Sequence, residues 1–191
     1  MVEEIGPKIY KIVGNGNVYL YLEPEPFLID SSDHIDSEYI KSEISKIISP
    51  NKIKYILLTH LHYDHCGNVD LFPNAKVYAS RKEIKNFRNS FDDFFIFDIS
   101  KIAFEKLEHS IAFSNEIFGL KVVKTPGHTG GSVAFFDSIN KILFSGDTLF
   151  HKGIGRTDFI NSVPENMEES VKKLKVILSD EDIQLMPGHD Y

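Results

Sequence analysis

The sequence predicts an α/β protein in which two β-sheets pack face to face and helices cover their outer sides. Runs rich in β-branched and aromatic residues recur in both halves of the chain, and each half also contains an amphipathic helical pattern. No linker or low-complexity tract interrupts this order, so we expect residues 1–191 to form a single domain. The composition, 42% hydrophobic and 26% charged, is that of a globular chain with its own core.

Short β-rich runs separated by turn residues open the chain, at residues 9–14, 17–22 and 27–30. Ser37 is expected to cap a helix whose isoleucines fall on one face, and Pro50 ends it. The next run, KYILLTH at residues 54–60, is apolar on both faces. Such a run is typical of a strand inside a sheet that helices cover.

The remaining pattern predicts a short helix at 81–87 and strands at 75–80, 117–125, 132–137, 141–147 and 183–186. The strands 132–137 and 141–147 are expected to pair as a hairpin. Ser162 stands three residues before Glu165, which is the capping-box spacing and indicates the start of a second long helix.

The segment between Phe87 and Phe113 has no clean period of either kind. Because aromatic clusters usually bury area, we expect its aromatic side chains, in particular those at 87–104, to pack in the core or between helices. A substrate lid and a dimer face are the alternatives. The phenylalanines concerned are Phe87, Phe91, Phe94, Phe95, Phe97, Phe104 and Phe113.

Charge and composition restrict the partners. The chain has 21 Lys and Arg against 28 Asp and Glu, a net charge of −7, without a basic tract, so nucleic acids and anionic membranes are disfavoured. No apolar run approaches the roughly 18 residues of a membrane span, and the first residues lack a secretory signal pattern. Cys66, the single cysteine, cannot form an internal disulfide and is expected to be buried. We expect a cytoplasmic monomer or homodimer that acts on a small molecule.

The stretch THLHYDH, which ends the run 54–60 and continues to residue 65, concentrates three histidines and a carboxylate. His60 and His62 point the same way if the chain stays extended, whereas Asp64 and His65 can turn toward a neighbouring point. Imidazole and carboxylate together suit zinc, iron or manganese, and one cysteine rules out a thiolate-rich site. The stretch therefore predicts a metal site with ligands for one or two ions.

Such a loop needs further ligands from elsewhere in the chain. His128, Asp147 and His189 each stand at the end of a predicted strand, next to glycine. Glycine lets the backbone turn sharply beside a ligand, and strand ends are where α/β proteins place their sites. These residues are therefore the candidates that complete the site.

The motifs HLHYDH, PGHTGGS, SGDTLF and PGHD, in this order along nearly the whole chain, resemble the ligand motifs of the metallo-β-lactamase superfamily. The resemblance implies a four-layer αβ/βα sandwich with metals at one edge of the sheets. It implies a first metal site of His60, His62 and His128, a second of Asp64, His65 and His189, and a bridging Asp147. Asp30 falls where the family often has a partner for a ligand histidine.

Within the superfamily, SGDTLF followed by GIGRTDF looks closest to glyoxalase II-like thioesterases and to persulfide dioxygenases. The first likeness implies hydrolysis of a hydroxyacyl thioester by a metal-bound hydroxide, with Asp64 and Asp147 as catalytic carboxylates. Two divalent ions are expected, zinc first and iron or manganese next. A persulfide dioxygenase with one iron and a lactonase are the alternatives. Glyoxalase II has a further helical domain after its last ligand histidine, and we expect this protein to be without it, so glutathione is not the expected thiol carrier.

Two cations are candidates for holding an anionic end of the substrate. Arg156 matches a position where the family places a cation near the substrate, and Lys152 lies close by. Arg156 is preferred because its planar fork binds carboxylates in a bidentate manner, although a surface ion pair with Asp158 is the alternative. The histidines without a motif, His34, His109 and His151, are expected at the surface; for His151 alone, the edge of the pocket is the alternative.

Overall fold

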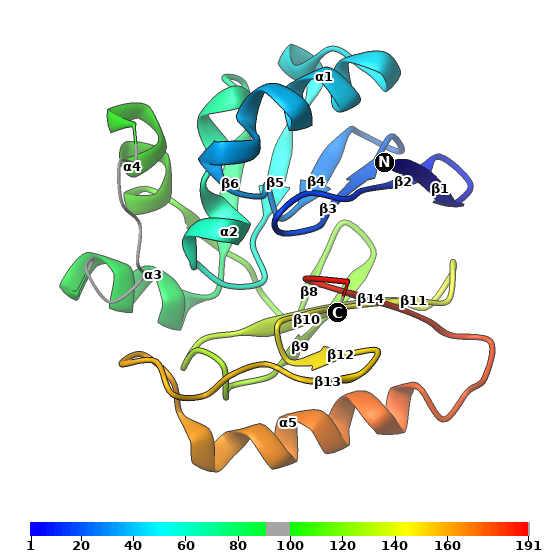
Figure 1. Ribbon diagram of the computed structural model, residues 1–191, viewed down its shortest axis with the longest axis vertical. Helices are drawn as coiled ribbons and strands as arrows, with labels where there is room; N and C mark the ends of the chain where they lie inside the picture. The colour runs from blue at the N-terminus through cyan, green and yellow to red at the C-terminus, as the bar shows by residue number, and fades with distance from the viewer. Residues whose placement is uncertain (91–99, 191) are drawn as a thin grey trace.

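The computed structural model describes residues 1–90 and 100–190 of the chain. Figure 1 shows two stacked sheets, with α1 above the first and α5 below the second. This is the four-layer arrangement, and it confirms the α/β sandwich that the sequence predicts.

The first sheet has seven strands in the order of the chain. Its first four strands are antiparallel, whereas β4 to β7 run parallel. The strands are β1 (Val2–Gly6), β2 (Ile9–Ile12), β3 (Val18–Tyr21), β4 (Phe27–Ile29), β5 (Tyr55–Leu57), β6 (Lys76–Ala79) and β7 (Ile111–Ala112).

The second sheet has five strands in the order β14-β11-β10-β9-β8. These are β8 (Glu116–Ile117), β9 (Leu120–Lys124), β10 (Val133–Asp137), β11 (Ile142–Gly146) and β14 (Gln184–Pro187). The last strand pairs in parallel with β11, which brings the C-terminal segment beside the residues that follow β11. A separate pair, β12 (Leu149–Phe150) and β13 (Gly153–Ile154), forms a small ribbon.

The helices lie outside the sheets. They are α1 (Ser37–Ile47), α2 (Tyr63–Cys66), α3 (Arg81–Asn89), α4 (Lys101–Glu108) and α5 (Pro164–Ile177), with short 3₁₀ turns at η1 (His34–Asp36), η2 (Pro50–Lys52) and η3 (Val69–Leu71). Helix α5 covers the second sheet, and the other helices belong to the half of the molecule that contains the first sheet (Figure 1).

Successive side chains of a strand point to opposite faces of the sheet and therefore enter different layers of the core. On β3, Val18 and Leu20 join the core beneath α1, whereas Tyr19 lies in the core between the sheets. On β11, Phe144 faces the same inter-sheet core and Leu143 faces the core beneath α5. Each sheet is therefore apolar on both faces, and a fully buried side chain of this size stabilises the fold by about 1.5–3 kcal/mol. Three apolar layers between four layers of secondary structure hold the sandwich together.

Three local expectations are wrong. Ser37 does not cap α1 but donates from its hydroxyl to His34 O and Asn68 Oδ1. The capping box at Ser162 does not form either, since Val163 is the N-cap residue and Ser162 Oγ donates to His128 O. The single strand expected at 117–125 is a hairpin, because the backbone turns through positive φ at the end of β8.

Aromatic packing fits the expectation for the described part of the phenylalanine-rich segment. Phe87 is buried and its ring centroid lies 5.6 Å from that of Phe104, while Phe113 packs edge-on against Phe135 at 5.5 Å. Phe91, Phe94, Phe95 and Phe97 lie outside the described residues. Cys66 is buried as expected. Over residues 1–90 and 100–190, no helix combines the length and apolar character that crossing a membrane requires.

Candidate metal centre

The chain changes conformation within the motif that follows β5. His62 is still extended, with φ −67° and ψ 152°, and α2 begins at the next residue. Asp64 and His65 therefore leave the backbone from a helical turn, whereas His62 leaves it from extended backbone and His60 lies between β5 and this turn. As the sequence predicts, one short loop presents side chains to two neighbouring positions.

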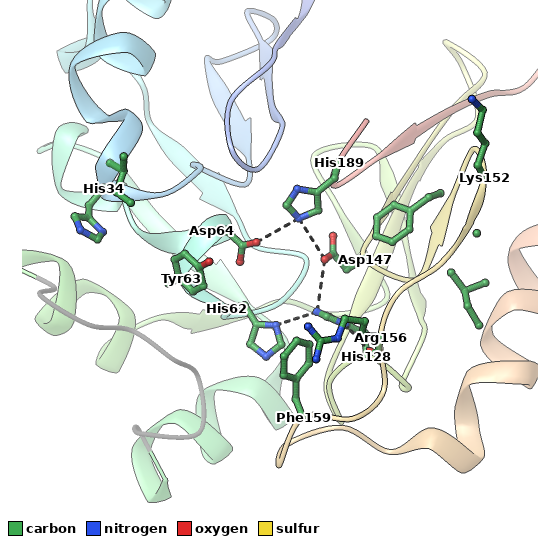
Figure 2. A pocket seen from close by; sticks show the side chains of 14 residues that line it. His34, His62, Tyr63, Asp64, His128, Asp147, Lys152, Arg156, Phe159 and His189 are labelled. Atoms are coloured by element: carbon green, nitrogen blue, oxygen red, sulfur yellow. Dashed lines mark hydrogen bonds and ion pairs between the residues drawn. The ribbon is translucent and has the colours of Figure 1, made fainter. Parts of the chain in front are cut away.

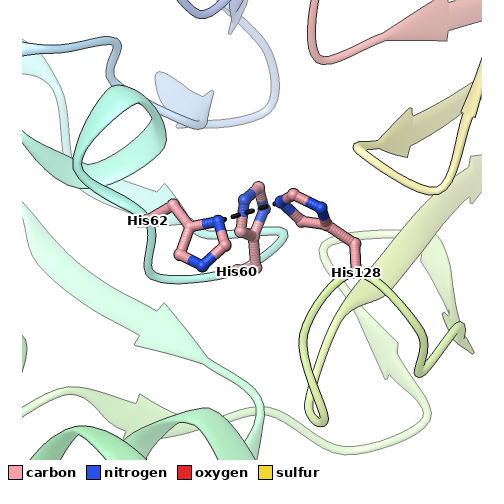
Figure 3. A group of neighbouring side chains, drawn as sticks. All are labelled: His60, His62 and His128. Atoms are coloured by element: carbon pink, nitrogen blue, oxygen red, sulfur yellow. Dashed lines mark hydrogen bonds between the residues drawn. The ribbon is translucent and has the colours of Figure 1, made fainter. Parts of the chain in front are cut away.

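The first group, which we call the first triad, consists of His60, His62 and His128 (Figure 3). Their ligand nitrogens lie within 4.8 Å of one another, and His62 Nδ1 is 2.9 Å from His128 Nε2. All three side chains are buried. His60 Nε2 makes no hydrogen bond to any residue that the structure describes. Because a buried polar atom without a partner is costly, this nitrogen indicates a site for a cation.

The second group, the second triad, consists of Asp64, His65 and His189. His189 Nε2 lies 3.3 Å from His65 Nε2 and 3.3 Å from Asp64 Oδ2. Asp147 stands between the triads, as Figure 2 shows: Oδ2 is 3.6 Å from His128 Nε2 and 3.4 Å from His189 Nε2. Its other oxygen, Oδ1, is 3.2 Å from His65 Nε2. The structure thus brings together all seven ligands that the sequence motifs indicate.

In three of the histidines, the ring nitrogen that faces away from the centre is hydrogen-bonded to an oxygen atom. His65 Nδ1 is 2.9 Å from Asp30 Oδ2, His128 Nδ1 is 2.8 Å from Arg156 O, and His189 Nδ1 is 2.6 Å from Asn15 O. An acceptor at Nδ1 keeps a ring proton there and directs Nε2 at the centre, where its lone pair is available to a metal once Nε2 carries no proton. This arrangement prepares the imidazoles to bind a divalent metal.

Residues 12–189 match the family model of the metallo-beta-lactamase superfamily. The chain belongs to this superfamily. It is 32% identical over 200 residues to a probable metallo-hydrolase of Streptococcus pyogenes serotype M6, which covers 95% of this chain and 83% of that protein. It is 33% identical over 171 residues to a hydroxyacylglutathione hydrolase of Francisella tularensis subsp. novicida, covering 86% of this chain and 61% of the relative.

A solved structure of TTHA1623 in a di-iron-bound form has the same fold, with a TM-score of 0.71 and 28% sequence identity. The match covers 92% of this chain and 88% of that one. The chain spans less than two thirds of the length of the hydroxyacylglutathione hydrolase that it matches. The family and the fold are therefore clear, whereas the substrate has to be argued from the site.

Glycine allows the close approach of segments in this metallo-β-lactamase centre. A Cβ atom on Gly188 would lie 2.1 Å from Asp147 Oδ1, and one on Gly155 would lie 1.8 Å from Asp147 O. No side chain fits at either position without moving the aspartate. For Gly188, which stands beside His189, this close approach is the steric reason for the glycine that the sequence places there.

The C-terminal ligand is fixed by the hairpin turn that joins β2 and β3. Asn17 N donates to Gly188 O over 2.8 Å, and Tyr19 OH donates to Pro187 O over 2.6 Å. Lys11 Nζ forms an ion pair with Asp190 at 2.6 Å. The backbone on both sides of His189 is therefore held by residues of the first sheet and its turn. No local pattern in the sequence indicates this support, because asparagine is common in turns for other reasons.

The two triads differ in charge. Burial and the neighbouring His128 ring lower the pKa of His62 to about 4, and burial also lowers the pKa of His60 and His128. For His189, burial acts in the same direction, but contacts with Asp147 and Asp64 outweigh it and raise the pKa to about 9. The pKa of His65 is raised in the same way by Asp147, Asp30 and Asp64 against the effect of burial.

A cavity of about 750 Å³ opens over the centre (Figure 2). Its lining combines ligands of both triads with apolar side chains and two cations: His34, Ile35, His62, Tyr63, Asp64, His128, Asp147, Phe150, Lys152, Gly153, Ile154, Arg156, Phe159 and His189. Arg156 forms two hydrogen bonds with Asp158, at 2.9 and 2.8 Å, and its guanidinium lies 4.7 Å from the centre of the Phe159 ring. Lys152 forms no ion pair within the described part of the chain.

The three histidines outside the motifs are all exposed. Of these, His34 lines the cavity, whereas His151 and His109 are not among its lining residues. His34 reaches the cavity because η1 precedes α1 at the rim of the first sheet. The expectation that these histidines lie at the surface is confirmed, but the one at the edge of the cavity is His34 and not His151, which follows β12.

Proposed function

We propose that this protein is a metal-dependent hydrolase that cleaves an acyl thioester of the hydroxyacyl type. The observation that carries the proposal is the pair of triads sharing Asp147 at the floor of a cavity large enough for a small substrate. The similarity to a metallo-hydrolase and to a hydroxyacylglutathione hydrolase supports the reaction class.

The donor set fits two divalent ions, zinc being the first candidate. His60, His62 and His128 would hold one, Asp64, His65 and His189 the other, and Asp147 would contact both. The buried and unpartnered His60 Nε2 is the feature of the chain that most requires an ion. When bound, such ions polarise the substrate carbonyl and lower the pKa of a coordinated water toward about 7.

Asp64 is the residue of the chain placed to orient the attacking water. It lines the cavity, and its carboxylate is only partly buried. Burial raises its pKa, but His65 and His189 together lower it further than burial raises it, so the group is ionised at neutral pH. An ionised carboxylate at this place accepts a hydrogen bond from a water molecule and thereby turns the lone pair of the water oxygen toward the substrate.

The leaving group explains why a thioester suits this site better than an amide. A thiol has a reference pKa of about 8.5, so it departs as a thiolate with little proton assistance. The cavity wall is mainly apolar on the side of Phe150 and Ile154, and its cations are Lys152 and Arg156. These cations are suited to an anionic end of the substrate rather than to protonation of a leaving amine.

The test is a substrate panel on protein of known metal content. Protein purified without added metal is analysed for its elements and then assayed with hydroxyacyl thioesters, lactones and a persulfide. We expect two metals per chain and thioester cleavage that a chelator abolishes and added zinc restores. One iron per chain with oxygen uptake on the persulfide would identify a dioxygenase instead, and cleavage of lactones alone would identify a lactonase.

A further inference from the structure

A carboxylate outside the metal-ligand motifs lies between the two loops of the first triad. Glu83 is in the first turn of α3 and is 0% exposed. Within the described residues it forms no ion pair. A buried carboxylate is costly unless hydrogen bonds compensate, so its surroundings indicate what keeps it there.

Three donors surround the Glu83 carboxylate. Leu61 N donates to Oε2 over 3.1 Å, while Thr129 Oγ1 and Gly131 N each donate to Oε1 over 2.9 Å. Leu61 stands between His60 and His62, and Thr129 directly follows His128. One carboxylate thus joins the two chain segments that supply all three imidazoles of the first triad.

The first turn of α3 is built for this contact. Ser80 Oγ accepts from Glu83 N over 3.1 Å, as in a capping box, but the Glu83 side chain faces the two loops instead of returning to the helix start. Ser80 Oγ also donates to Gly131 O over 2.7 Å. A Cβ on Gly131 would lie 2.6 Å from Glu83 Oε1, so the close approach requires glycine there.

The second triad depends on other residues. His65 is held by Asp30 and His189 by Asn15, and Glu83 bonds to neither. We propose that Glu83 is a positioning residue for the first triad: it sets the separation of the two loops and thereby the affinity and geometry of a metal ion held by His60, His62 and His128. Hydrogen-bond partners behind metal ligands act in this manner in other metalloproteins.

The substitution Glu83→Gln tests the proposal with little change of shape. In the glutamine variant the amide NH₂ group faces the backbone N–H of Leu61 or of Gly131. Two donors cannot bond to each other, so at least one of these hydrogen bonds is lost. Cobalt titration of the full chain with visible spectra, together with anomalous diffraction at limiting zinc, gives the occupancy of each triad. We expect the first triad to bind metal about 10–100-fold more weakly and the second triad to be unchanged within the error of the titration.

Two further variants complete the design. Glu38→Gln, an exposed residue of α1, is the matched control and should leave both triads unchanged. Thr129→Val removes one donor to Glu83 while keeping the side-chain shape, and should weaken the first triad in the same direction by less, which keeps the test decisive if Glu83→Gln does not fold. Equal weakening of both triads, or an unaffected first triad, would overturn the proposal. Because the experiment measures metal occupancy, its result does not depend on whether a thioester is the substrate.

Discussion

The two triads of the metal centre have the same number of ligands and share Asp147, but the chain supports them in different ways. The first triad is all imidazole, and a buried side chain of α3 joins its loops. The second triad includes a carboxylate and depends on Asp30 and on the turn between β2 and β3. Hydrogen bonds from two separate parts of the fold therefore surround the two halves of the centre.

The same division appears in the charges. The histidines of the first triad have lowered pKa values and are neutral at pH 7, whereas His65 and His189 have raised ones because carboxylates surround them. Neutral imidazoles are ready to bind a metal, while protonated ones must first release a proton. The comparison therefore predicts that the triads differ in how they respond to substitution and to pH.

The largest effect is expected where the triads meet. Asp147→Ala removes the carboxylate that contacts His65, His128 and His189, so metal binding and turnover should be lost together. Since loss of a partner behind a ligand costs about 10–100-fold in affinity, loss of a shared ligand should exceed about 100-fold. Elemental analysis and thioester turnover measure both quantities, and an active variant with normal metal content would contradict the shared role.

Asp30→Asn should weaken mainly the second triad. Asp30 Oδ2 accepts from His65 Nδ1 and from Thr59 Oγ1, and Oδ1 accepts from Thr59 N. The amide keeps the shape but removes the charge, and we expect a loss of about 10–100-fold at the second triad with a smaller loss at the first, through Thr59 beside His60. Glu83→Gln and Asp30→Asn should therefore weaken metal binding mainly at different triads. Equal losses of affinity at the same triads in the two variants would contradict separate support of the triads.

The seven candidate ligands stand out in the sequence because four lie in one stretch rich in histidine and the other three stand beside glycine at strand ends, in an order that resembles a known family. The residues that hold these candidate ligands in place could not be found in the sequence. Glu83 has ordinary capping-box spacing from Ser80, and Asn15 reads as a turn residue, so neither carries a local signal of what it contacts. Only the packing of α3 and of the β2–β3 turn against the ligand loops reveals their roles.

The strands of the fold are likewise predictable from the sequence only in part. Runs rich in β-branched and aromatic residues predict β3, β10 and β11, and these strands are buried on both faces. The two-residue strands β7, β12 and β13 are too short to have a period, and sheet neighbours rather than local sequence decide them. The hairpin at 117–125 was missed because Phe118 adopts φ 50°, a conformation that a bulky residue rarely takes.

The pH dependence of metal binding separates the triads by their pKa values. Below about pH 9 the His189 imidazole is protonated in the metal-free protein, so a metal ion must displace a proton. The affinity of the second triad should therefore rise by about tenfold per pH unit between pH 7 and 9 for each proton released, and level off above. His62, with a pKa of about 4, is already neutral over this range, and the first triad should change little. Metal titrations at several pH values, with histidine NMR of the metal-free protein, measure both; parallel slopes would contradict the comparison.

The smallest effect concerns the two cations of the cavity. Arg156, preferred from the sequence, is already neutralised by Asp158, whereas Lys152 forms no ion pair among the described residues. Lys152→Ala should therefore raise KM for an anionic thioester more than Arg156→Ala does, by up to about fivefold, since an exposed ionic contact contributes at most about 1 kcal/mol. A neutral thioester of the same size is the control, because its KM should not respond. If Arg156→Ala has the larger effect, the arginine must leave Asp158 to bind the substrate, and Asp158→Asn should then lower KM by freeing it.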